Sequence, residues 1–297
     1  MLACAAALAA PVASGEISTN AVTAITGTEG DDVIDLASPT NASAVQVFTT
    51  NAPRTTLSEA TGVAGLGGHD RITAGADLSA GAEATVNIPF DNFDYRGKEA
   101  IALGTGIAGG AGQDAITNAA TLTSTATARL DVGEAFSTII FGVTGLPSEA
   151  DALSTGIAGG EDLDTIINYG TTIVSANATS SVVKVRISSL EIPVEILGLG
   201  DARTIANSTA VGLSGGTNGL SGSGPQTLEN QGALAVHAGA DASAWQLAIE
   251  LVGAARIDDA TTASARATGM AGDASDDSLS HSGPPDAPWS SRRNWLI

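Results

Sequence analysis

The chain of 297 residues has a single cysteine and few aromatic residues. With Cys4 alone, it can form neither an internal disulfide nor a cluster of thiolate metal ligands. Hydrophobic residues make up 43% of the chain but aromatic residues only 3%, so most of the apolar content is alanine, valine, isoleucine and leucine. We therefore expect a thin interior lined by small side chains instead of a thick core.

Basic residues are scarce as well. The chain has 12 Lys and Arg against 32 Asp and Glu, which gives a formal net charge of −20. This balance disfavours nucleic acid and anionic membrane surfaces as partners and favours cations. The same acidity would also keep an extracellular surface soluble, and the two interpretations are compatible.

Long apolar runs are missing beyond the first residues. No later run approaches the roughly 18 residues that a membrane helix needs, so we expect no transmembrane segment. The opening MLACAAALAAPVASG is apolar and ends like a signal-peptidase site, but it lacks the basic residues that lead a signal peptide. We interpret residues 1–15 as a truncated signal peptide, which predicts a secreted protein or one at a bacterial cell surface.

A phrase that recurs six times dominates the rest of the chain. It consists of a threonine, a glycine-rich turn, an aspartate and, two residues later, an aliphatic residue. The copies begin at positions 23, 61, 105, 155, 211 and 268, so the steps are 38, 44, 50, 56 and 57 residues. The copy from Val211 has six extra residues before its aliphatic residue and carries Gln226 in place of the aspartate. A repeat of this period predicts stacked structural units.

Alternation with a period of two residues follows each phrase and is typical of a strand with one buried face. After the phrase from Thr105, the apolar or small residues of one face are Leu122, Ser124, Ala126, Ala128, Leu130 and Val132. Between phrase and strand, Asn118, Asn168 and Asn230 begin Asn-x-Gly or related corners, where stacked asparagines can hydrogen-bond between coils.

These patterns predict an all-β fold, a parallel β-solenoid of the β-helix or β-roll type, built from repeats of about 38–57 residues. The solenoid is expected to span residues 16–283 as a single domain, with one or two coils for each repeat. Residues 284–297 hold two of the three tryptophans and do not continue the pattern, so we interpret them as an atypical tail, either disordered or marking a truncation.

The segments GGAGQDAI from Gly109 and GTEGDDVI from Gly27 resemble the Gly-Gly-x-Gly-x-Asp-x-aliphatic nonapeptide of the haemolysin-type (RTX) calcium-binding proteins. In that family, carboxylates and glycine carbonyls from neighbouring turns enclose Ca²⁺. By this resemblance, the carboxylate ligands are Asp32, Asp70, Asp114, Asp164 and Asp277. The backbone ligands it implies are the carbonyls around Gly27, Gly30, Gly65, Gly68, Gly109, Gly110 and Gly112. Here, however, the nonapeptide occurs once in each long repeat and not in tandem.

A physical argument also favours a cation at the recurring aspartate. Coils that stack at the β-sheet spacing of about 4.8 Å bring the aspartates into a column of like charge. At an effective dielectric constant near 20, neighbouring carboxylates at that distance repel each other by roughly 3 to 4 kcal/mol. A divalent ion between coils would reverse the sign of this interaction. In the alternative interpretation, each aspartate points into water and caps its own turn.

No catalytic residues are predicted. Ser214 fits a Gly-x-Ser-x-Gly pattern, but a nucleophile elbow ends an apolar strand and opens a helix, whereas we expect Ser214 to lie in a loop rich in glycine and serine. The three histidines show no metal-ligand spacing. The sequence thus predicts a calcium-binding structural or adhesive module, with cell-surface glycans or other surface proteins as further partners. The alternatives are a metal-free adhesin passenger like those of autotransporters and a carbohydrate-active β-helix enzyme.

Overall fold

The computed structural model describes residues 17–49, 53–91, 97–137, 148–188, 202–216, 226–250, 259–272 and 277–282. In these ranges the chain forms seventeen β-strands and no helix, and hence no helix that could span a membrane. The predicted truncated signal peptide (1–15) and the predicted tail (284–297) lie outside the described residues.

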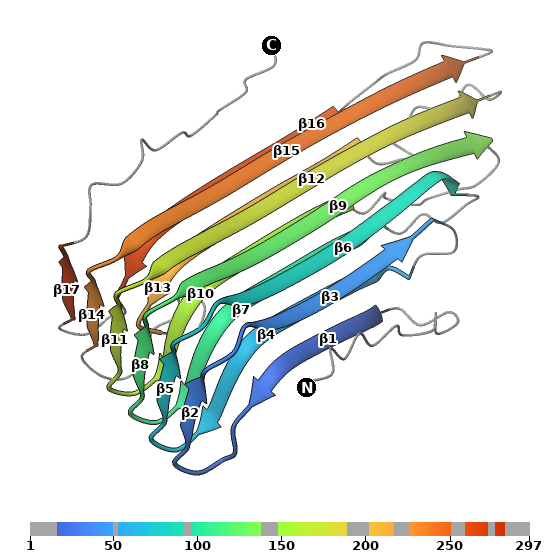
Figure 1. Ribbon diagram of the computed structural model, residues 1–297. Coiled ribbons are helices and arrows are strands. Elements are labelled where there is room, and N and C mark those ends of the chain that lie inside the picture. The colour runs from blue at the N-terminus through green and yellow to red at the C-terminus, as the bar shows by residue number, and fades with distance from the viewer. Residues whose placement is uncertain are drawn as a thin grey trace.

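The strands form three parallel sheets (Figure 1). Each of the first five repeats supplies one strand to each sheet, and the described part of the sixth supplies strands to sheets A and B. Sheet A consists of β1 (Ile17–Thr26), β4 (Thr55–Gly67), β7 (Glu99–Ala111), β10 (Ser148–Glu161), β13 (Ala202–Ser214) and β16 (Asp259–Ala271). Sheet B consists of β2 (Val33–Leu36), β5 (Arg71–Ala74), β8 (Ala115–Asn118), β11 (Thr165–Asn168), β14 (Thr227–Asn230) and β17 (Ser278–His281). Sheet C consists of β3 (Thr40–Phe48), β6 (Leu78–Asp91), β9 (Thr121–Ser137), β12 (Thr171–Ser188) and β15 (Ala233–Glu250).

The predicted all-β parallel solenoid is therefore confirmed, and the repeat corresponds to one coil of three strands. Sheets A and C face each other, and the short strands of sheet B close one edge between them (Figure 1). The sequence steps grow from coil to coil, yet the phrases stay in register: Thr61 pairs with Thr23 and with Thr105. Much of the added length enters sheet C, whose strands grow from 9 residues in β3 to 18 in β12.

The interior between sheets A and C is narrow and consists largely of alanine. Ala60, Ala102 and Ala152 of sheet A lie in one cluster with Ala84, Ala128 and others of sheet C, and all are buried. A second cluster, next to sheet B, holds larger side chains such as Ile72, Ile116 and Ile166. The alternation predicted for β9 is confirmed, because the six residues assigned to its inner face are all buried.

Asparagines line the corner between sheets B and C. The Nδ2 of Asn118 donates to the Oδ1 of Asn168 over 2.8 Å, and the Nδ2 of Asn168 donates to the Oδ1 of Asn230 over 2.6 Å. The turn beside them needs glycine, because a Cβ on Gly170 or Gly232 would lie 2.0 or 1.9 Å from a carbonyl oxygen. The predicted Asn-x-Gly corner with hydrogen bonds between coils is thus confirmed.

Replacing Asn168 by alanine tests the contribution of this ladder. The substitution removes both ladder bonds and leaves buried polar groups of Asn118 and Asn230 without these partners. Each such group lowers the free energy of unfolding by about 1–3 kcal/mol. We expect the Tm to fall by several degrees, since 1 kcal/mol corresponds to roughly 2–4 °C for a larger domain. The matched control is Asn177→Ala, on the outer face of β12, where the side chain bonds to Ser175. Equal thermal melts for the two variants would contradict a stabilising ladder.

Candidate metal centre

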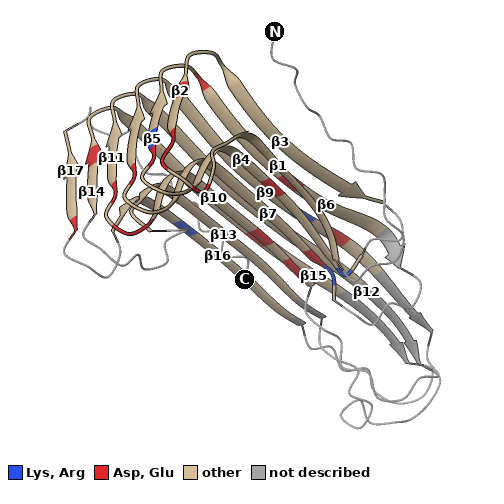
Figure 2. Ribbon diagram, turned by 90° about the horizontal axis from the view of Figure 1, so that it is seen from below, with Lys and Arg blue, Asp and Glu red and all other residues tan. Residues whose placement is uncertain are grey.

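Each recurring aspartate lies at the corner between sheets A and B, directly before a short strand. Asp70 precedes β5, Asp114 precedes β8 and Asp164 precedes β11. Because the short strands pair in strict register, these residues stack along the solenoid axis. Acidic residues gather along this corner (Figure 2). We define the aspartate column as Asp32, Asp70, Asp114, Asp164 and Asp277, with Gln226 at the corresponding position of the fifth coil.

In every column aspartate after Asp32, one carboxylate oxygen bonds to the preceding coil. The Oδ1 of Asp70 accepts from the backbone N–H of Asp32 over 2.8 Å, and the Oδ1 of Asp114 accepts from that of Asp70 over 2.8 Å. The Oδ1 of Asp164 accepts from the N–H of Asp114 over 2.9 Å. The column therefore caps backbone groups between coils, a pattern that was not predicted from the sequence.

The second oxygens of the three central carboxylates are buried. Asp70, Asp114 and Asp164 are each 2% exposed, and their Oδ2 atoms have no hydrogen-bond partner among the described residues. These three side chains therefore do not point into water as the turn-capping alternative assumed. Asp32 does cap its own turn, since its Oδ2 accepts bonds from the backbone N–H and the hydroxyl of Thr28 and its side chain is only partly buried.

Glycine is required opposite these oxygens. A Cβ added to Gly65, Gly109 or Gly159 would lie 2.2–2.4 Å from the Oδ2 of the aspartate in the same coil. The turn after these glycines is left-handed at Gly110 and Gly112, whose φ angles are +116° and +118°. Of the glycines named by the RTX resemblance, Gly27, Gly65 and Gly109 thus let the backbone pass close to a carboxylate, whereas Gly68, Gly110 and Gly112 pack against the backbone of a neighbouring coil. Whether their carbonyls bind a metal stays a prediction.

Burial changes the ionisation of the column. It raises the pKa of Asp114 to about 6 and that of Asp164 to about 7, against an ordinary value of 3.8. The hydrogen bond from the preceding coil opposes the shift, and the neighbouring aspartates add to it. Burial also raises the pKa of Asp70. A buried carboxylate oxygen without a donor is costly, so a proton or a cation would stabilise the site.

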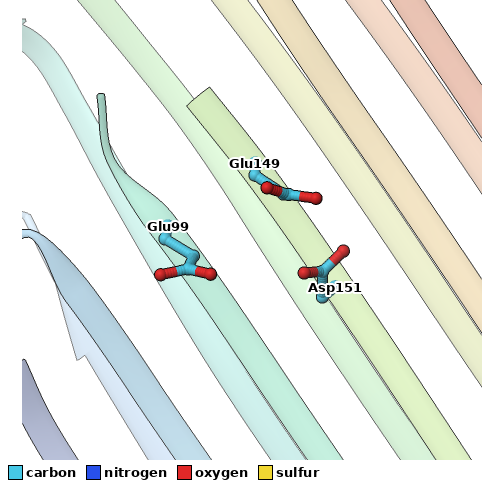
Figure 3. Close-up of side chains that lie close together, drawn as sticks. All are labelled: Glu99, Glu149 and Asp151. Atoms are coloured by element: carbon cyan, nitrogen blue, oxygen red, sulfur yellow. The ribbon is translucent and has the colours of Figure 1, made fainter. Parts of the chain in front are cut away.

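A second acidic group lies outside the recurring phrase, on the outer face of sheet A. Carboxylate oxygens of Glu99 on β7 and of Glu149 and Asp151 on β10 lie within 4.8 Å of one another and could hold a metal ion (Figure 3). We call these three residues the acidic triad. The Nδ2 of Asn207 donates to Glu149 and to Asp151, both over 2.9 Å, and the hydroxyl of Thr55 donates to Glu99 over 2.8 Å.

Burial and the proximity of the other acids raise the pKa of Glu149. Burial also raises the pKa of Asp151, with Glu99 adding to the shift and the bond from Asn207 opposing it. The triad was not predicted from the sequence, although a signal was present. Glu99 and Glu149 each stand six residues before the threonine of their phrase, so their stacking follows from the repeat alignment.

Comparison with protein-family models, with curated proteins and with solved structures found no match.

The pKa shifts predict how stability depends on pH when calcium is chelated. A folded-state pKa above the ordinary value means that the protonated aspartates favour the folded state. Their contribution to the free energy of unfolding is complete below about pH 4 and is lost as the pH rises through about 6 to 7. We therefore expect the Tm in EDTA to fall between pH 5 and pH 8.

The double variant Asp114→Asn and Asp164→Asn should flatten this dependence, since it removes the two carboxyl groups with pKa values of about 6 and about 7. The control Asp241→Asn removes one charge from an exposed position on β15 and should keep the slope of the wild-type chain. Thermal melts across the pH series measure both slopes, and a slope unchanged in the double variant would contradict the assignment.

Proposed function

We propose that this chain is a calcium-binding β-solenoid that serves as a rigid structural or adhesive module, secreted or displayed at a bacterial cell surface. The observation that carries the proposal is the set of buried Oδ2 atoms of Asp70, Asp114 and Asp164, which have no partner among the described residues. Three such oxygens at one corner need either protons or cations to balance them.

The chemistry of the corner favours calcium. Carboxylate and backbone carbonyl oxygens suit a hard cation, and Ca²⁺ tolerates an irregular set of oxygen ligands. Mg²⁺ demands near-octahedral geometry and usually keeps several waters, which suits a buried column poorly. With pKa values of about 6 and 7, Asp114 and Asp164 are largely or partly ionised at neutral pH, so calcium competes with protons for them. The net charge of −20 adds a general attraction for cations.

The acidic triad is a second location for calcium in this proposal. It lies on the outer face of sheet A, where an ion would be accessible to a partner that supplies further oxygen ligands. Cell-surface glycans and acidic surface proteins have such oxygens. The continuous parallel pairing of the stacked coils would hold this face rigid, which suits a structural or adhesive role.

The proposal is tested by thermal melts of the full chain in EDTA and in millimolar calcium, with magnesium alongside. Calcium at a hundred times its Kd would stabilise the folded chain by about 2.7 kcal/mol, a rise in Tm of roughly 5–10 °C. Asp114→Asn and Asp164→Asn should each reduce the calcium-induced rise in Tm, whereas Asp241→Asn should not. The loss of this rise in Glu149→Gln measures how much of it comes from calcium bound at the triad.

Identical melts in EDTA and calcium would overturn calcium binding and leave protons as the balancing charge, which favours the metal-free adhesin. An equal rise with magnesium would point to charge screening instead of a calcium site. A rise that survives in the column variants but disappears in Glu149→Gln would place the ion at the triad alone.

A further inference from the structure

The fifth coil carries Gln226 where the other coils carry the aspartate, and the ladder still continues through it. The Oε1 of Gln226 accepts from the backbone N–H of Asp164 over 3.0 Å. Its own backbone N–H donates to the Oδ1 of Asp277 over 2.9 Å. The side chain is 1% exposed. Gln226 therefore replaces the aspartate in both bonds between coils.

The amide differs from a carboxylate in its second polar atom. The Nε2 of Gln226 donates to the backbone carbonyl of Asp162 in the fourth coil. Both polar atoms of this side chain are therefore hydrogen-bonded, whereas the Oδ2 of Asp164, one coil earlier, has no partner among the described residues. The amide supplies the donor that the aspartates lack.

Gln226 also occupies the space that the carboxylate takes in other coils. A Cβ on Gly215 would lie 2.7 Å from its Cγ, just as a Cβ on Gly159 would lie 2.4 Å from the Oδ2 of Asp164. The six extra residues of this coil fall between β13 and β14, next to this substitution. The longer side chain thus reaches the same position from a corner of different length.

The carbonyl of Asp162 stands where a backbone ligand would be expected. Asp162 has a φ of +76° and follows Gly160 by two residues, as Gly112 follows Gly110 in the coil that pairs with it. Gly112 is among the positions whose carbonyls the RTX resemblance names as ligands. In the fourth coil, the amide of Gln226 binds this carbonyl instead.

We infer that Gln226 ends the cation-binding part of the column, because its amide takes the place of a cation between the fourth and fifth coils. The inference rests on the proposed function and specifies where its ions lie. Cation positions are then confined to the pairs Asp32 with Asp70, Asp70 with Asp114 and Asp114 with Asp164. Asp277 is separated from them by a neutral coil.

The test compares Gln226→Glu with the wild-type chain. Glutamate keeps the length of the side chain but replaces the donor by a charge, so it removes the hydrogen bond to the carbonyl of Asp162 and restores a carboxylate next to Asp164. We expect the variant to bind one more calcium ion per chain in equilibrium dialysis and to show a larger difference in Tm between EDTA and calcium. Asp164→Asn should bind fewer ions than the wild-type chain.

An unchanged ion count in Gln226→Glu, together with a lower count in Asp164→Asn, would overturn the inference while leaving the proposed function intact. A wild-type chain that binds no calcium would overturn both. Hydrogen exchange of the wild-type chain does not depend on the folding of any variant. Added calcium should protect the amides of β5, β8 and β11 strongly and those of β17 weakly, and equal protection in β17 would also overturn the inference.

Discussion

Parallel pairing of the coils in strict register is the constraint on which this molecule depends. It places each residue of a coil directly against the equivalent residues of the coils above and below, at about 4.8 Å. A side chain therefore has to be compatible with copies of itself. Alanine meets this condition in a narrow interior, because it packs closely without polar groups or large volume. The same constraint explains why few aromatic residues are needed.

Two polar columns meet this condition in different ways. An asparagine has both a donor and an acceptor, so Asn118, Asn168 and Asn230 satisfy one another along the corner. An ionised aspartate only accepts, so a column of aspartates can bind backbone N–H groups with one oxygen but leaves the other without a donor. The difference between the two corners is thus a difference in hydrogen-bonding capacity: the asparagines bond to one another, whereas Asp70, Asp114 and Asp164 each keep a buried oxygen without a donor among the described residues.

The fold and the aspartate column could be predicted from the sequence because both follow from the repeat. The phrases and the alternating strands define the register, and register alone stacks Asp70, Asp114 and Asp164. Their burial could not be predicted, since a turn rich in glycine does not indicate which way its side chains face. Prediction of the acidic triad would have required extending the repeat alignment six residues upstream of the phrase, to Glu99 and Glu149. Gln226 is recognisable in the sequence as a substitution, but its role depends on a contact with Asp162 that only the folded chain makes.

The growth of sheet C gives the solenoid a taper. Nine residues of β3 pair with β6, whereas 17 residues of β12 pair with β9 and 18 pair with β15. The later coils are therefore held to their neighbours by about twice as many backbone contacts in this sheet as the first ones. Coils of such unequal width are not interchangeable, because deleting one would bring together strands whose lengths differ more than those of the present neighbours. Under mechanical load, we expect the narrow first coils to separate from their neighbours more easily than the wide later coils, because fewer residues pair between them in sheet C.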